Sequence, residues 1–213
     1  DSVWHTFNNH RLLSSAVLSD ALKLKSDTLN LVYYTITATV FKGDKKEEHS
    51  ANITLLSEII PKQLTIKTGA AYPHNNTNFT EGFFFNNGMV YESSGLNGNS
   101  FICRYKLGSV KPERLTTLPN EYFGEGSILF NNKLIQLTWK NGVGVVYDAT
   151  NLKHIKAFRI GGEDWGLTYT GTNVIMSDGT HRVFYLDTAN YAPIKFCEVY
   201  DNKVRVVYLN ELE

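Results

Sequence analysis

The feature that most constrains the fold is an internal repeat in the larger, C-terminal part of the chain. Three segments align with one another through Gly82, Gly126 and Gly166, which are 44 and 40 residues apart. Each repeat has a short apolar run, an Asn-Asn or Thr-Gly turn, a second apolar run and two further β-like runs. A period of about 40 residues with four strands is typical of a β-propeller blade. Because the repeats lack the apolar period of a helix, the sequence predicts an all-β propeller.

The number of repeats is smaller than a closed propeller needs. Three are full, and a fourth opens at Leu209–Glu213, where Glu211 falls in register with Glu81 and Glu125. Propellers close with roughly four to eight blades, because a smaller ring leaves strand edges unpaired. We therefore expect residues 61–213 to be the N-terminal part of a propeller in a truncated chain.

Residues 1–60 carry no such repeat. Leu29–Phe41 and Ser50–Leu56 are β-like runs on either side of the charged stretch Lys42–Glu48, which predicts a hairpin with a charged tip. Pro61 cannot donate a ladder hydrogen bond, so we place a domain boundary there. The prediction is a small β-sandwich-like domain at residues 1–60.

Two segments beside these elements are less sharply defined. Leu12–Leu24 fits either a short helix or an irregular strand. Gln63–Thr68 precedes the first repeat by the length of a connecting loop, and we expect it to form an outer strand of the propeller.

Composition excludes several classes of protein. Lys plus Arg and Asp plus Glu each number 21, so the formal net charge is zero, which argues against a nucleic-acid partner. The apolar runs are far shorter than the roughly 20 residues of a membrane span, so we expect no membrane span. Cys103 and Cys197 have no metal-ligand spacing and are interpreted as small buried hydrophobic residues.

Candidate functional residues lie where the repeats begin. In a propeller the first strand of each blade lines the central channel, and ligands bind at one mouth of it. Glu81, Glu125, Trp165 and Asn210 occupy these positions, and Trp139 ends a second strand. The alternative is structural: a Gly-Glu-Gly segment also suits a close-packed strand with a solvated glutamate, and repeated tryptophans also pack blade against blade.

Seven sequence blocks resemble the signatures of a known family. They are Phe79-Thr-Glu-Gly, Tyr91-Glu-Ser-Ser-Gly95, Tyr122-Phe-Gly-Glu-Gly126, Gln136-Leu-Thr-Trp139, Asp164-Trp-Gly-Leu167, Met176-Ser-Asp-Gly179 and Leu209-Asn-Glu-Leu-Glu213. In order and spacing they look like the glutamine cyclotransferases, the plant and bacterial type of glutaminyl-peptide cyclotransferase. The resemblance implies a five-bladed propeller that converts the N-terminal glutamine of peptide substrates into pyroglutamate and releases ammonia.

The resemblance also implies roles for the candidate residues. Glu125 would move the proton as general base and then general acid. Trp139 and Trp165 would form the walls of the substrate pocket, and Asn210 would orient the substrate amide. No cofactor is implied, and no metal. The family usually has glutamine where this chain has Glu81. We expect Glu81 to contact the substrate, and as a second carboxylate near Glu125 it should raise the pKa of one of the two groups by like-charge repulsion.

Two functional hypotheses follow. The first is a metal-independent glutaminyl-peptide cyclotransferase. The second is a non-catalytic, exported propeller that binds peptides or other small amine ligands, with Glu81 receiving the amine. Residues 1–60 look like the small β-domain of some bacterial members, which are exported. We therefore expect a periplasmic or cell-envelope location.

Overall fold

The computed structural model describes residues 2–8, 10–15, 24–27 and 29–212. Every regular element in that part of the chain is a β-strand. The strands belong to two compact units, one made of residues 1–62 with 200–205 and the other of residues 63–199 with 206–213. We propose that these units are the two domains of the chain.

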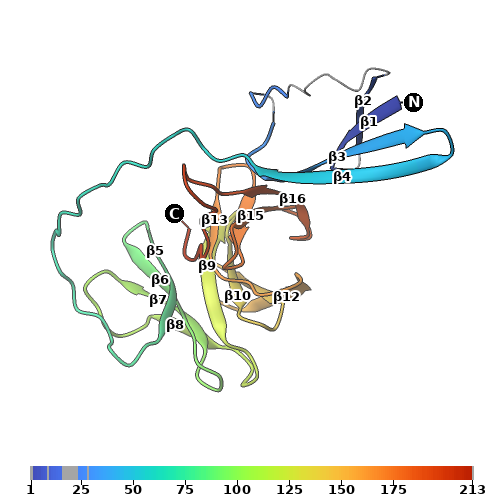
Figure 1. The fold of residues 1–213 in the computed structure, drawn as a ribbon. Coiled ribbons are helices and arrows are strands. Elements are labelled where there is room, and N and C mark those ends of the chain that lie inside the picture. Colours follow the sequence, from blue (N-terminus) through green and yellow to red (C-terminus); the bar gives the residue numbers. More distant parts are fainter. Residues whose placement is uncertain (1, 9, 16–23, 28, 213) are drawn as a thin grey trace. The chain divides into compact units, whose positions relative to one another are not determined.

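The first unit contains a single four-stranded antiparallel sheet in the order β2-β1-β3-β4 (Figure 1). Its strands are β1 (Ser2–Phe7), β2 (His10–Ser15), β3 (Tyr33–Lys42) and β4 (Lys45–Thr54). The described residues of this unit show this one sheet, so the second layer of the expected sandwich is not among them. Of the ambiguous stretch Leu12–Leu24, residues 12–15 belong to β2, whereas residues 16–23 lie outside the described residues.

The charged stretch of the first unit lies in a strand and only partly in the hairpin tip. The turn between β3 and β4 needs only Gly43 and Asp44, and Gly43 has a φ of 59°. Lys45–Glu48 therefore pair directly with β3. This differs from the expected seven-residue tip, because a two-residue turn with positive φ matches the twist of the two strands.

The second unit contains three four-stranded antiparallel sheets, which are blades of a β-propeller (Figure 1). The first is β5 (Thr80–Asn86), β6 (Met89–Ser94), β7 (Phe101–Lys106) and β8 (Arg114–Thr117). The second is β9 (Gly124–Phe130), β10 (Lys133–Thr138), β11 (Val143–Asp148) and β12 (His154–Arg159). The third is β13 (Leu167–Tyr169), β14 (Val174–Ser177), β15 (Arg182–Leu186) and β16 (Pro193–Glu198). Each repeat of the sequence forms one blade, so the prediction of an all-β propeller is confirmed.

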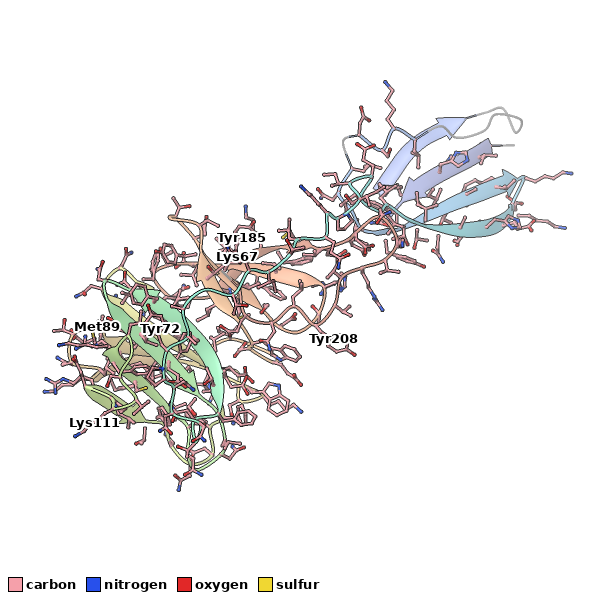
Figure 2. The ribbon with its side chains drawn as sticks, turned by 90° about the vertical axis from the view of Figure 1, so that its left-hand side faces the viewer. Lys67, Tyr72, Met89, Lys111, Tyr185 and Tyr208 are labelled. Carbon is pink, nitrogen blue, oxygen red and sulfur yellow. The ribbon has the colours of Figure 1, made fainter. Side chains whose placement is uncertain are left out.

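Local sequence explains the hairpins that open the first two blades. Asn87 and Gly88 join β5 to β6, and Asn131 and Asn132 join β9 to β10, all with positive φ. Two-residue turns of this kind favour asparagine and glycine, which tolerate the left-handed conformation. Figure 2 shows the side chains that the blades carry, with Met89 and Lys111 labelled on the first blade and Tyr185 on the third.

Apolar layers between neighbouring blades form the core. Leu134 of β10 belongs to the layer shared with the first blade, whereas Ile135 and Leu137 belong to the layer that also holds residues of the third blade. All three side chains are fully buried. Because successive side chains of a strand point to opposite faces, a middle blade must be apolar on both.

The repeat glycines are required where the inner strands approach one another. A Cβ atom on Gly82 would lie 2.8 Å from the backbone nitrogen of Ser127, and one on Gly126 would lie 2.8 Å from the Cα of Gly166. A Cβ on Gly166 would lie 2.7 Å from the carbonyl oxygen of Asn210 in the same way. The repeat period therefore reflects a backbone-to-backbone contact between neighbouring repeats.

Three expectations from the sequence are wrong in detail. Gln63–Thr68 is exposed and irregular, because no described strand pairs with it. Residues 209–212 lie against Gly166 but form no strand. Cys103 is buried in the middle of its blade, whereas Cys197 is exposed because β16 is the outer strand of the third blade.

Candidate active site

One cavity of about 350 Å³ brings together all five candidate residues. The cavity residues come from the starts of two blades and from three connecting segments: Glu81 from β5, Glu125 from β9, Trp139 from directly after β10, Trp165 from the segment before β13, and Asn210 from the C-terminal segment. The inner strands of the first two blades thus meet the segment before β13 and the C-terminal segment at one site. The volume lies in the range of small-molecule pockets, roughly 300–1,000 Å³.

Two phenylalanines that sequence reasoning did not select complete the lining: Phe79 and Phe123. Phe123 lies between Phe79 and Trp139, with edge-on ring contacts at centroid distances of 5.9 Å and 5.5 Å. The backbone N–H of Trp139 donates to the carbonyl oxygen of Phe123 at 2.9 Å. These contacts form an apolar wall along one side of the carboxylates, because such aromatic pairs add packing energy to the burial of their surface.

Glycines provide the space for the side chains of this wall. A Cβ on Gly95 would lie 2.5 Å from the ring of Phe123 and 3.1 Å from the Cγ of Glu81. A Cβ on Gly179 would lie 2.6 Å from the indole of Trp165. Each glycine ends a sequence block that contains the end of a second strand, β6 or β14. This shared position is the signal in the sequence for their role.

Glu125 is the most buried carboxylate of the cavity, with 6% of its surface exposed. Burial, and then the negative charges of Glu81, Glu211 and Glu163, raise its pKa to about 9. A carboxyl group with this pKa is protonated near neutral pH. A cation entering the cavity would lower this pKa, because an opposite charge favours the ionised carboxylate.

Glu81 lies in the same cavity, and burial raises its pKa as well. Its charge is the largest electrostatic contribution to the raised pKa of Glu125. The site therefore contains two interacting carboxyl groups, and the pKa of each is raised.

Glu163 is a further residue that sequence reasoning missed. It lies outside the cavity lining, yet its carboxylate accepts hydrogen bonds from the indole N–H groups of both Trp139 and Trp165. Its position two residues before Trp165 gave no clue, because the bond to Trp139 joins residues far apart in the chain.

The described residues contain no group of three or more His, Cys, Asp or Glu side chains arranged to hold a metal ion. Nor do they include a helix with the length and apolar character that a membrane crossing requires. A larger cavity of about 420 Å³ lies along β5, β9 and β13 and is lined by Phe83, Phe85 and Tyr169 among others, but by none of the five candidates.

Comparisons with known proteins agree with this geometry. The sequence pattern of the glutamine cyclotransferase family matches residues 36–213. A glutaminyl-peptide cyclotransferase of Arabidopsis thaliana is 36% identical over 150 residues, which cover 70% of this chain and 47% of the plant protein. The crystal structure of Myxococcus xanthus glutaminyl cyclase superposes with a TM-score of 0.61 at 28% identity, over 66% of this chain and 60% of the bacterial one.

The chain thus spans about half the length of the curated relative that it matches. The family match nevertheless includes the three blades, the cavity and all seven sequence blocks. The resemblance seen in those blocks is therefore confirmed, and the chain belongs to the glutamine cyclotransferase family.

Proposed function

We propose that this protein cyclises N-terminal glutamine of peptides to pyroglutamate and releases ammonia. The observation that carries the proposal is the cavity of about 350 Å³ in which a buried carboxyl, Glu125, is enclosed by two tryptophans and a second carboxyl. The reaction needs one group that first accepts and then donates a proton, in a place that excludes water. Glu125 has the burial and the raised pKa that suit this task.

The proposed step moves one proton through Glu125. The substrate enters as an ammonium, whose charge lowers the pKa of Glu125 so that its carboxyl ionises. The ammonium then transfers a proton to this carboxylate. The freed amine nitrogen attacks the side-chain amide carbon of the same glutamine, so that a ring C–N bond forms. The C–N bond to the amide nitrogen then breaks, and Glu125 protonates that nitrogen. The second proton of the attacking amine passes to the departing ammonia, so the products are pyroglutamate and an ammonium ion, and Glu125 ends ionised as it began.

The other cavity residues act on position and charge in this proposal. Glu81 receives the substrate ammonium, because its carboxyl lies in the same cavity as Glu125. Trp139 and Trp165 hold the glutamine side chain folded toward its own amine. The substrate therefore gives up its conformational freedom on binding and not in the reaction step, which lowers the barrier. Asn210 hydrogen-bonds the amide oxygen, on which negative charge develops.

The first test is release of ammonia from dipeptides that begin with glutamine. We expect turnover by the protein and an equal rate after dialysis against EDTA, since Glu125 rather than a metal ion carries the proton. Dipeptides with an acetylated amine should not react, because they lack the nucleophile. A rate abolished by EDTA and restored by a divalent metal would contradict the metal-independent mechanism.

The same assay separates the second hypothesis. A protein that binds glutamine-initiated peptides in calorimetry, yet releases no ammonia from them, would be a binding propeller. Glu81 would then serve as an acceptor for the amine of the ligand, and Glu125 would have no chemical role.

The Glu81→Gln variant is expected to shift the pH dependence of the reaction. Among the neighbouring charges, that of Glu81 raises the pKa of Glu125 most, so its removal makes Glu125 ionise at lower pH. The acid limb of the profile of kcat/KM against pH should therefore move to lower pH. Glu113→Gln, on the surface of the first blade, is the control and should leave the profile in place. Superimposable profiles of the parent and Glu81→Gln would contradict the coupling of the two carboxyl groups.

Export to the periplasm or cell envelope stays a prediction. It rests on the resemblance of residues 1–60 to a domain found in exported bacterial members of the family.

A further inference from the structure

Glu163 joins two tryptophans that belong to different blades. Its Oε2 atom accepts a hydrogen bond from Nε1 of Trp139 at 2.9 Å and another from Nε1 of Trp165 at 3.1 Å. Trp139 follows β10 of the second blade, whereas Trp165 precedes β13 of the third. A single carboxylate oxygen therefore connects the two blades beside the cavity.

These hydrogen bonds fix the part of each tryptophan that the backbone leaves free. The backbone N–H groups of Trp139 and Trp165 donate to the carbonyl oxygens of Phe123 and Ser177. Those bonds hold the main chain but leave the side-chain torsions undetermined. An indole N–H can only donate, so a shared acceptor sets the direction of both rings at once.

The ion pair of Glu163 is the weaker of its interactions. Nζ of Lys140 lies 3.9 Å from Oε1 of Glu163 and 3.9 Å from the centre of the Trp139 ring, and its side chain is exposed. Exposed ion pairs contribute little to stability. The two indole donors, with Trp139 first, keep the pKa of Glu163 below its usual value, so the acceptor stays ionised at neutral pH.

We propose that Glu163 is a positioning residue, which sets the spacing and direction of the Trp139 and Trp165 walls without touching the substrate. The proposal rests on the proposed function for its kinetic consequences, but not for its structural ones. Glu163 does not line the cavity, so it acts on the substrate only through the two rings.

Two variants separate the hydrogen bonds from the charge. Glu163→Leu removes both, whereas Glu163→Gln keeps an oxygen that accepts hydrogen bonds but removes the charge. The matched control is Glu113→Leu with Glu113→Gln. Glu113 is also a partly exposed glutamate, 43% against 41% for Glu163, and its ion pair with Lys106 is 3.8 Å long.

The first measurement needs no enzymatic activity. In a Trp4→Phe background, only Trp139 and Trp165 remain as tryptophans. We expect Glu163→Leu to lose most of the near-UV circular dichroism of the two indoles and to increase their quenching by acrylamide. Far-UV spectra should stay unchanged, which shows that the fold is intact. Glu163→Gln should keep the indole signal of the parent, as should both control variants.

The second measurement is kinetic. Glu163→Leu should lower kcat/KM for a glutamine-initiated dipeptide about ten- to a hundredfold, mainly through KM, because misplaced walls no longer hold the folded substrate. The KM of Glu163→Gln should stay within about twofold of the parent value, since the amide oxygen keeps the directions of the two indoles. Its pH profile should nevertheless move to lower pH, because the charge of Glu163 contributes to the raised pKa of Glu125.

The outcomes distinguish this proposal from the function on which it rests. An unchanged indole signal in Glu163→Leu would overturn the positioning role, whatever the activity. So would a loss of the same size in Glu113→Leu. If the parent protein releases no ammonia, the proposed function fails. The circular dichroism and quenching of the indoles still test whether Glu163 positions the two tryptophans.

Discussion

Replacement of Glu125 by glutamine is expected to lower kcat about 10²- to 10⁴-fold, with KM for glutamine-initiated peptides changed much less. Glutamine has the same shape, so the cavity and the tryptophan walls are kept. What is lost is the ability to take a proton from the amine and return it to the departing nitrogen. The measurement is ammonia release under saturating dipeptide, compared with the parent protein.

The split between kcat and KM tests the role itself. If Glu125 only attracted the substrate ammonium, the variant would raise KM and leave kcat near the parent value. Undiminished turnover would remove Glu125 from the mechanism altogether. The control is Glu113→Gln, whose carboxylate faces solvent in the first blade and should not affect either constant. Equal melting temperatures of parent and Glu125→Gln would show that the loss is chemical rather than structural.

The propeller could be predicted because its repeat records a local physical need. Gly82, Gly126 and Gly166 recur since each lies against the backbone of the next repeat, and only glycine fits. The same register places Glu81 beside Glu125 in one cavity, which is why a repeat alignment was enough to gather them. Prediction succeeded where position in the repeat determines position in space.

The parts that could not be predicted depend on contacts between residues far apart in the chain. Glu163 has no motif of its own, and its importance comes from an indole 24 residues away. Residues 200–205 join the first unit, where the N–H of Ser57 donates to the carbonyl oxygen of Asp201. Gln63–Thr68 has the composition of a strand, but a strand also needs a partner edge, which composition does not reveal.

The raised pKa of Glu125 could be predicted from the sequence only in part. The sequence indicates a second carboxylate at Glu81, and like charges raise a pKa. It could not indicate that burial is the larger cause, or that Glu211 and Glu163 also contribute. Those contributions require the closeness of three blades and the C-terminal segment, which only the folded chain provides.

The Gly126→Ala variant is expected to lose more stability than any other single change considered for this protein. The added methyl group would lie 2.8 Å from the Cα of Gly166 and 2.9 Å from Oε1 of Glu211, and it would be closer still to the carbonyl oxygen of Trp165. Two of these three atoms belong to the backbone of the next blade, so they cannot rotate away. The N–H of Gly126 also donates to that carbonyl oxygen at 2.8 Å, and the two blades would have to part to admit the methyl group.

We expect the free energy of unfolding to fall by about 2–3 kcal/mol, as for overpacked cores, and Tm by roughly 5–10 °C. The matched control is Gly161→Ala in the connection after β12, where an added Cβ meets no atom within 4 Å and φ is not positive. That variant should stay within about 0.5 kcal/mol of the parent. Chemical denaturation of the three proteins measures the difference. Equal stability of Gly126→Ala and Gly161→Ala would mean that the inner strands are further apart than this structure has them. The repeat glycines would then need a reason other than the contact between blades, and the register that places Glu81 and Glu125 in one cavity would lose its physical basis.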